Sequence, residues 1–185
     1  HGKNGPLNVK KSTRDDDLLL DKFVEAGAQA GFPLTNDFNG KQQEGFSRYE
    51  HTIKGSKRFS SARAYLHPSL KRKNLKTKVN ITVDKVIFEN KKAIGVEYLE
   101  KGIKKFCKSN KEVILSSGAV NSPQILMRSG IGDPDEIKKH GIQVNHELKG
   151  VGKNLQDHIA VVSQFQCTQP VTLHRSASFF GTMLA

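Results

Sequence analysis

Residues 118–132 read GAVNSPQILMRSGIG, a glycine followed by a Ser-Pro pair, an apolar run and a closing Ser-Gly-Ile-Gly. The run that leads into them, Glu112–Ala119, is short and apolar and ends in small residues. Such a run is typical of a buried strand that brings its carboxyl end to a ligand crevice. The Ser-Pro pair predicts a helix start, because proline in the first helical turn lacks only an N–H that has no partner there. Taken alone, the stretch also fits an ordinary strand-turn-helix without a ligand.

Downstream of this stretch the sequence predicts a second short helix between Asp133 and Gly141. An Asp-Pro pair supplies its cap and a preset backbone angle, and the glycine ends it. A glycine-rich turn, GVGKNLQDH, follows over residues 150–158. From Ile159 to Phe165 apolar and polar residues alternate, which predicts another strand.

Upstream, the N-terminal third combines one helix with one long polar loop. Asp15–Asp17 supply a cap and a negative first turn for a helix that runs to Ala30 and ends at Gly31. Residues 36–46 contain turn residues without periodicity, which is typical of a lid or a binding surface.

The middle of the chain changes from a helical period to a period of two. Ser60–Leu66 predicts a helix start, closed by Pro68 and the basic run after it. Residues 79–98 alternate in polarity around a turn at residues 89–92, which predicts a small antiparallel meander. Together the elements predict a mixed α/β fold without internal repeats.

The 185 residues suffice for one ordinary domain and are too few for two large ones. The chain opens at His1 and stops within the apolar stretch Ser178–Ala185, whereas domain boundaries usually fall in polar linkers. We therefore expect an internal piece of a longer polypeptide, with any targeting segment outside it.

The formal net charge of +12 raises nucleic-acid binding as one class of function. The distribution of the charge argues against it. Lysine outnumbers arginine 23 to 7, and the densest basic run, residues 71–78, has no aromatic residue for base stacking. A solvated basic face that binds polyanions weakly explains the charge equally well, so we predict no specific nucleic-acid partner.

The two cysteines, Cys107 and Cys167, lie far apart, and neither has a CxxC partner or a histidine at metal-ligand spacing. We therefore predict no metal site. Two stray thiols fit a reducing compartment, although a single disulfide stays open. No run reaches the roughly 18 consecutive apolar residues of a membrane-spanning helix. The predicted location is cytoplasmic or peripherally membrane-associated.

The motif at residues 118–132 resembles a defining pattern of the glucose-methanol-choline (GMC) oxidoreductases, a family of flavoproteins that oxidise alcohols. Further segments resemble the same family, in the order found in its choline dehydrogenase-like members. These segments are HGKNGPL at the start, GFPLTNDFNGKQQEGF, FSSARAYLHP, the meander and GVGKNLQDH. The resemblance therefore covers nearly the whole chain.

This resemblance implies parts of two domains. Residues 1–45 would belong to a substrate-domain insertion with a lid-like loop. Residues 46–157 would belong to a Rossmann-type FAD-binding domain that contains the antiparallel meander. Residues 158–185 would start the substrate-binding domain.

The resemblance also implies contacts with FAD at the meander and at the motif. In relatives, a valine at the place of Val83 offers its backbone N–H and C=O to the adenine, whereas alternation alone would make Val83 plain strand core. Gly118 and Ala119 would let the end of a strand approach the cofactor, while the helix turns its positive N-terminus toward it.

The glycine-rich turn supplies three more candidates, Asn154, Asp157 and His158, because it resembles the family segment that passes near the flavin. A structural hydrogen-bonding role fits these residues too. Adjacent side chains do not face one another on a helix, so the spacing of Asp157 and His158 does not imply a general-base pair.

By the same resemblance, the parent enzyme oxidises a primary alcohol, with choline to betaine aldehyde as the first choice and other GMC dehydrogenases or oxidases as alternatives. FAD takes the hydride while a histidine takes the hydroxyl proton. In the family that histidine and its His or Asn partner lie near the C-terminus, beyond residue 185. None of the seven histidines is therefore assigned a catalytic role, and the segment alone is expected to be inactive.

The family's dinucleotide fingerprint, GxGxxG, is not completed by Gly130-Ile131-Gly132. In the family it lies near the N-terminus, so we expect it upstream of His1. The electron acceptor does not follow from this sequence.

Overall fold

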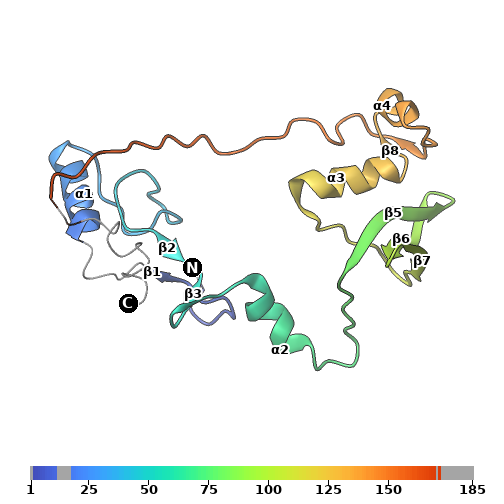
Figure 1. The fold of residues 1–185 in the computed structure, drawn as a ribbon, viewed down its shortest axis with the longest axis horizontal. Coiled ribbons are helices and arrows are strands. Elements are labelled where there is room, and N and C mark those ends of the chain that lie inside the picture. Colours follow the sequence, from blue (N-terminus) through green and yellow to red (C-terminus); the bar gives the residue numbers. More distant parts are fainter. Residues whose placement is uncertain (1, 12–17, 170, 172–185) are drawn as a thin grey trace. The chain divides into compact units, whose positions relative to one another are not determined.

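The computed structural model describes residues 2–11, 18–169 and 171. These residues form two compact units, one up to Lys76 together with the stretch from Val162, and one from Thr77 to Val161 (Figure 1). The described part of the chain contains short helices and small sheets, which alternate along the sequence. The predicted mixed α/β class is confirmed at this level.

The first unit contains helix α1, Leu18–Gln29. The helix ends where the sequence predicts, because Gly31 takes φ +85°, a left-handed angle that stops helices and favours glycine. The predicted cap at Asp15–Asp17 lies outside the described residues. Two small antiparallel pairs complete the unit: β1 (Lys10–Lys11) with β2 (Glu50–His51), and β3 (Ile53–Lys54) with β4 (Lys57–Arg58).

An aromatic cluster ties α1 to the polar loop that follows it. The ring of Phe46 lies 5.4 Å from that of Phe23 and 5.5 Å from that of Phe32, measured between centroids. Phe46 also donates its N–H to the carbonyl of Pro33, and buried Thr35 donates its hydroxyl to the carbonyl of Gln42 at 2.7 Å. The loop is aperiodic, as predicted, and held by these bonds. Its lid role stays a prediction.

The helix predicted from Ser60 consists of two consecutive helical segments. A π-helical segment, η1 (Ala62–Leu66), passes directly into α2 (His67–Ser69). Pro68 lies inside the last helical stretch, which ends at Ser69, one residue after the proline and before the basic run. The predicted end of the helix is therefore confirmed to within a residue.

The second unit contains the predicted antiparallel meander, which the structure confirms. Strands β5 (Ile81–Glu89), β6 (Lys92–Glu100) and β7 (Ile103–Lys108) pair in that order. Two positive-φ residues, Asn90 and Lys91, make the first turn. Strand β7 was not among the predicted strands, because its sequence, IKKFCK, is rich in lysine and does not alternate between polar and apolar residues.

Helix α3, Gly118–Arg128, begins four residues before the predicted start. Pro123 therefore lies inside the helix. The N–H that it lacks would have bonded the carbonyl of Ala119, which is still in the first turn, so the loss is confined to the helix start. The hydroxyl of Ser122 accepts the N–H of Ser117 at 2.9 Å and satisfies one further donor there.

The short elements after α3 follow the prediction. Helix α4, Pro134–Lys139, is capped by the carboxylate of Asp133, which accepts the N–H of Asp135, and it ends before Gly141 at φ +67°. Strand β8 (Ile131–Gly132) pairs in parallel with β9 (His146–Glu147).

Two predicted strands are wrong. Glu112–Ala119 is not a strand up to the start of α3, and Ile114 is 77% exposed. Ile159–Phe165 also lies outside any strand, with Ile159 97% exposed. A strand needs a neighbour that accepts and donates its backbone hydrogen bonds. Within the described residues no segment pairs with either run.

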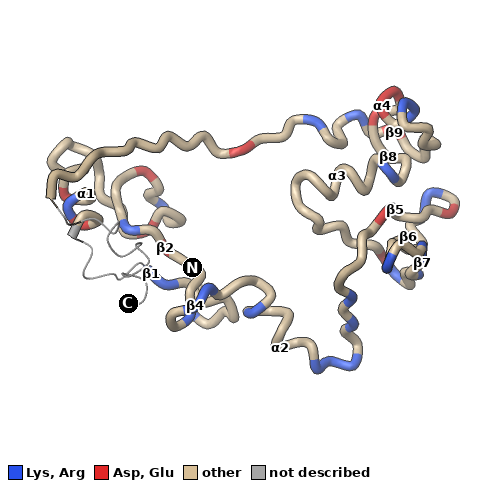
Figure 2. Tube along the Cα trace, in the orientation of Figure 1, with Lys and Arg blue, Asp and Glu red and all other residues tan. Residues whose placement is uncertain are grey.

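The basic residues are spread over both units, and the run 71–78 lies between α2 and β5 (Figure 2). On the meander, lysines pair with carboxylates of β6: Lys104 with Glu97 at 3.2 Å and Lys105 with Glu100 at 2.5 Å. The hydrogen bond from Lys105 and the charge of that lysine, with a smaller contribution from Lys78, hold the pKa of Glu100 below the ordinary 4.5. These pairs reduce the positive charge that this face presents.

The described helices are all too short or too polar to cross a bilayer. The boundary between the two units at Lys76 does not coincide with the predicted domain boundary at residue 46. The predicted domains refer to a longer enzyme, and they stay predictions.

Candidate functional site

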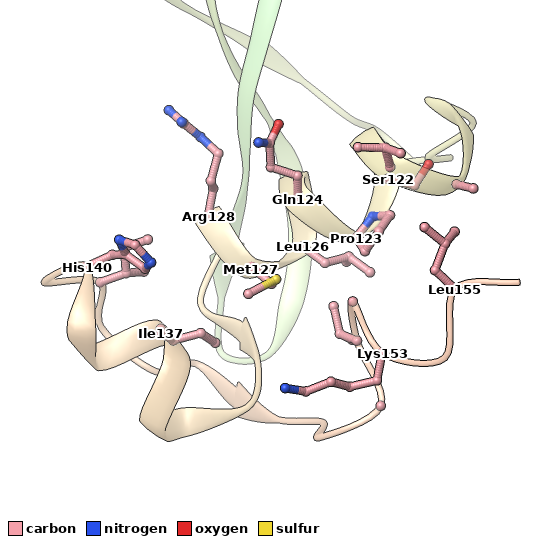
Figure 3. Close-up of a pocket in the computed structure, with 16 residues that line it drawn as sticks. Ser122, Pro123, Gln124, Leu126, Met127, Arg128, Ile137, His140, Lys153 and Leu155 are labelled. Atoms are coloured by element: carbon pink, nitrogen blue, oxygen red, sulfur yellow. The ribbon is translucent and has the colours of Figure 1, made fainter.

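A cavity with a volume of about 930 Å³ lies in the second unit. Helix α3 forms one wall, and α4 with the glycine-rich turn forms the other. Figure 3 shows Pro123, Leu126 and Met127 of α3 pointing toward the turn that carries Lys153 and Leu155. The lining residues are Ala119, Val120, Ser122, Pro123, Gln124, Leu126, Met127, Arg128, Ile137, His140, Ile142, Gly150, Val151, Gly152, Lys153 and Leu155.

Two glycines allow this cavity to form between closely packed segments. Gly152 takes φ +76°, and a Cβ there would lie 3.2 Å from the sulfur of Met127. Gly132 takes φ +156°, and a Cβ there would lie 3.2 Å from Ile137 and 3.3 Å from Met127. A side chain at either position would take a strained left-handed angle, and its Cβ would lie closer to Met127 than usual, so that Met127 would have to shift.

The cavity is apolar on its walls and positive at its edges. The N-terminal turn of α3 reaches it at Ala119 and Val120, where the helix carries unpaired N–H groups and partial positive charge. Gly118 takes φ +87°, and a Cβ there would meet open space, so its backbone can be approached closely. Lys153 and Arg128, which also line the cavity, each add a full positive charge. The arrangement can hold a ligand that combines an anionic part with a flat apolar part.

The structure brings only part of the predicted site to this cavity. Ala119 lines it, Gly118 precedes the lining residues, and Asn154, with φ +55°, lies between lining residues Lys153 and Leu155. The positive φ of Asn154 turns the chain so that both of its neighbours line the wall.

The other candidates lie elsewhere in the second unit. Asp157 and His158 do not line the cavity, and the carboxylate of Asp157 accepts the N–H of His158 at 2.8 Å. Val83 lies in β5 opposite Tyr98, half buried, and outside the cavity. Whether these residues contact a cofactor stays a prediction.

Sequence reasoning did not single out three of the lining residues, Met127, His140 and Lys153. Lys153 could have been found, because it is the cation inside the glycine-rich turn already singled out. Met127 belongs to the quoted motif, where its apolar side chain looks like core. His140 carries no local signal, since it closes an ordinary short helix.

The described residues contain no cluster of three or more side chains that could hold a metal ion. Cys107 and Cys167 are both exposed free thiols.

The similarity to proteins of known activity is extensive. The mitochondrial choline dehydrogenase of Homo sapiens is 51% identical over 173 residues, which cover 94% of this chain and 29% of that protein. The oxygen-dependent choline dehydrogenase of Chromohalobacter salexigens is 44% identical over 183 residues, 98% of this chain and 33% of that protein. The chain thus spans about a third of the length of the curated relatives it matches.

Solved structures resemble the chain over most of its length. Pyridoxine 4-oxidase from Mesorbium loti matches with a TM-score of 0.79 and 30% identity, over 85% of this chain and 31% of that one. An FAD-dependent oxidoreductase from Chaetomium thermophilum matches with a TM-score of 0.73 and 28% identity, over 85% and 28%. The profile of the GMC oxidoreductases matches residues 3–160, the greater part of the sequence and of both units. The chain therefore belongs to the GMC oxidoreductase family.

Proposed function

We propose that this chain is part of an FAD-dependent enzyme that oxidises the CH–OH group of a primary alcohol, with choline as substrate and betaine aldehyde as product. The observation that carries the substrate is the identity of 51% to human choline dehydrogenase across 94% of the chain. Other GMC dehydrogenases and oxidases are the alternatives, and oxidase names occur among the structural relatives. The proposed division into residues 1–45, 46–157 and 158–185 belongs to this enzyme.

The residues around the cavity fit part of FAD. FAD combines a pyrophosphate with flat ring systems, and the cavity combines the N-terminal turn of α3 and Lys153 with walls of Leu126 and Met127. Main-chain N–H groups at a helix start are suited to phosphate oxygens. The open space beside Gly118 leaves room for such an approach.

In this proposal FAD supplies the hydride acceptor, and the chain binds and orients it. The α3 start at Gly118 and Ala119 lies against the cofactor, Lys153 neutralises negative charge, and Asn154 holds the turn. Val83 contacts the adenine through its backbone. The base that takes the hydroxyl proton is proposed to lie outside these 185 residues, as are the groups that select the electron acceptor. The location, cytoplasmic or peripheral to a membrane, stays a prediction.

A lysine substitution tests the placement of the cofactor. In the complete polypeptide that carries this chain, Lys153→Ala should raise the Kd for FAD by about three- to tenfold, because one charge-assisted contact is lost. The Kd is measured by flavin fluorescence during titration of the apoprotein. Lys149→Ala is the matched control, since Lys149 belongs to the same segment, is exposed and does not line the cavity.

Equal weakening by both substitutions, with strong loss of binding in salt, would favour the alternative of a basic surface that attracts polyanions without a defined site. A purified protein without any bound or bindable flavin would contradict the proposal itself.

A further inference from the structure

Helix α3 is joined to strand β5 by three polar residues, Asp84, Arg128 and Ser129, which we call the clamp. Ser129 is 3% exposed, and its hydroxyl accepts the N–H of Val86 at 2.8 Å. The same hydroxyl donates to the carbonyl of Ile125 at 2.6 Å. One buried hydroxyl therefore connects the strand to the last turn of the helix.

The second half of the clamp is Arg128, which binds both the side-chain carboxylate and the backbone carbonyl of Asp84. Arg128 pairs with the carboxylate of Asp84 and donates from Nε to the carbonyl of Asp84 at 3.2 Å. The Asp84 side chain is 11% exposed, whereas that of Arg128 is 52% exposed. Arg128 also lines the cavity, whereas Asp84 and Ser129 do not, so the clamp joins the cavity wall to β5.

Asp84 lies at an irregularity in β5. The pairing with β6 shifts between Val83, which lies opposite Tyr98, and Lys85, which lies opposite Glu97. A bulge of this kind leaves one residue outside the regular ladder, and its backbone groups need other partners. Arg128 supplies the partner for the carbonyl of Asp84, which stabilises the bulge at this position.

The position of the bulge determines in which direction the backbone N–H and C=O of the preceding residue, Val83, point. In the order β5-β6-β7, β5 is an edge strand, so alternate backbone groups face away from β6. The N–H of Val86 is one of these groups, and it donates a hydrogen bond to the hydroxyl of Ser129. A shift of the bulge by one residue would reverse which groups of Val83 face outward.

We propose that Asp84, Arg128 and Ser129 are positioning residues that hold the backbone of Val83 in place for the adenine end of FAD. This inference rests on the proposed function, and it assigns these three residues a role in cofactor selectivity. Asp84 and Ser129 do not line the cavity, and in this inference the clamp acts through Val83. Its loss therefore affects FAD more than FMN, which has no adenine.

The experiment measures the Kd for FAD and for FMN with the apo form of the complete polypeptide. Asp84→Asn and Arg128→Gln should each raise the Kd for FAD by about tenfold, as expected for one lost charge-assisted bond, and leave the Kd for FMN unchanged. The double variant should be no worse than either single one, because both remove the same pair. Lys139→Gln is the control, since it removes an exposed ion pair with Glu136 on α4.

The outcomes separate this inference from the proposed function. Unchanged FAD affinity in folded clamp variants, or equal losses for FAD and FMN, would overturn the positioning role and leave the flavoenzyme proposal standing. A wild-type protein that binds neither flavin would overturn both. Since Arg128 lines the cavity and Asp84 and Ser129 do not, the decisive comparison is that of Asp84→Asn with Ser129→Ala, which also holds if Arg128→Gln unfolds the protein.

Discussion

Ile137 is 1% exposed, and it lies where α4 packs against β8, in contact distance of the position of Gly132. Its burial follows from local signals, because the capped helix from Asp133 places residue 137 on the inner face. Residues whose placement depends on neighbours distant in sequence were harder to predict. Asp157 and His158 stand beside the cavity-lining turn in sequence, and yet neither lines the cavity.

At this scale we predict that Ile137→Ala lowers the free energy of unfolding by about 2–5 kcal/mol, because it leaves a cavity beneath α4. Ile103→Ala, at a position of β7 that is 64% exposed, is the control and should change stability far less. Urea denaturation of both variants measures the difference. Equal effects would mean that α4 does not pack as described.

The elements with local start and stop signals were predicted well, and those that depend on partners were not. Helix α4 has its cap, its proline and its closing glycine within nine residues. The first hairpin of the meander has its turn at Asn90 and Lys91, which take positive φ angles. Helix α3 was misplaced, because Pro123 was taken as its first turn. The two strands predicted around Ile114 and Ile159 fail, because a strand forms only beside a partner and the sequence of the run cannot provide one.

For the meander we predict that Gly95→Ala destabilises the sheet by about 1–3 kcal/mol. A Cβ at Gly95 would collide with the carbonyl of Cys107 and the ring of Phe106 on the neighbouring strand. Gly150→Ala is the control, because nothing lies near a Cβ there. Thermal denaturation compares the two, and equal melting temperatures would contradict the packing of Phe106 over Gly95.

The whole chain spans about a third of its curated relatives, and its described part forms two units. Family membership could be predicted from the motif at residues 118–132 and the segments around it, because these are local patterns. The limits of the cavity could not be predicted from the sequence, since they depend on Gly132 and Gly152, which let separate segments pack against Met127. The proposed activity is that of the enzyme of which this chain is proposed to be part, so the central claim is tested on that complete polypeptide.

The most direct test is anaerobic mixing of the purified, FAD-loaded complete polypeptide with choline, followed by the absorbance of the flavin. The account predicts that choline bleaches the oxidised flavin and yields betaine aldehyde, because FAD would accept the hydride from the alcohol carbon. Bleaching by another primary alcohol and not by choline would contradict the choice of substrate. A flavin that stays oxidised with every alcohol tested, or a protein that binds no FAD, would contradict the account as a whole.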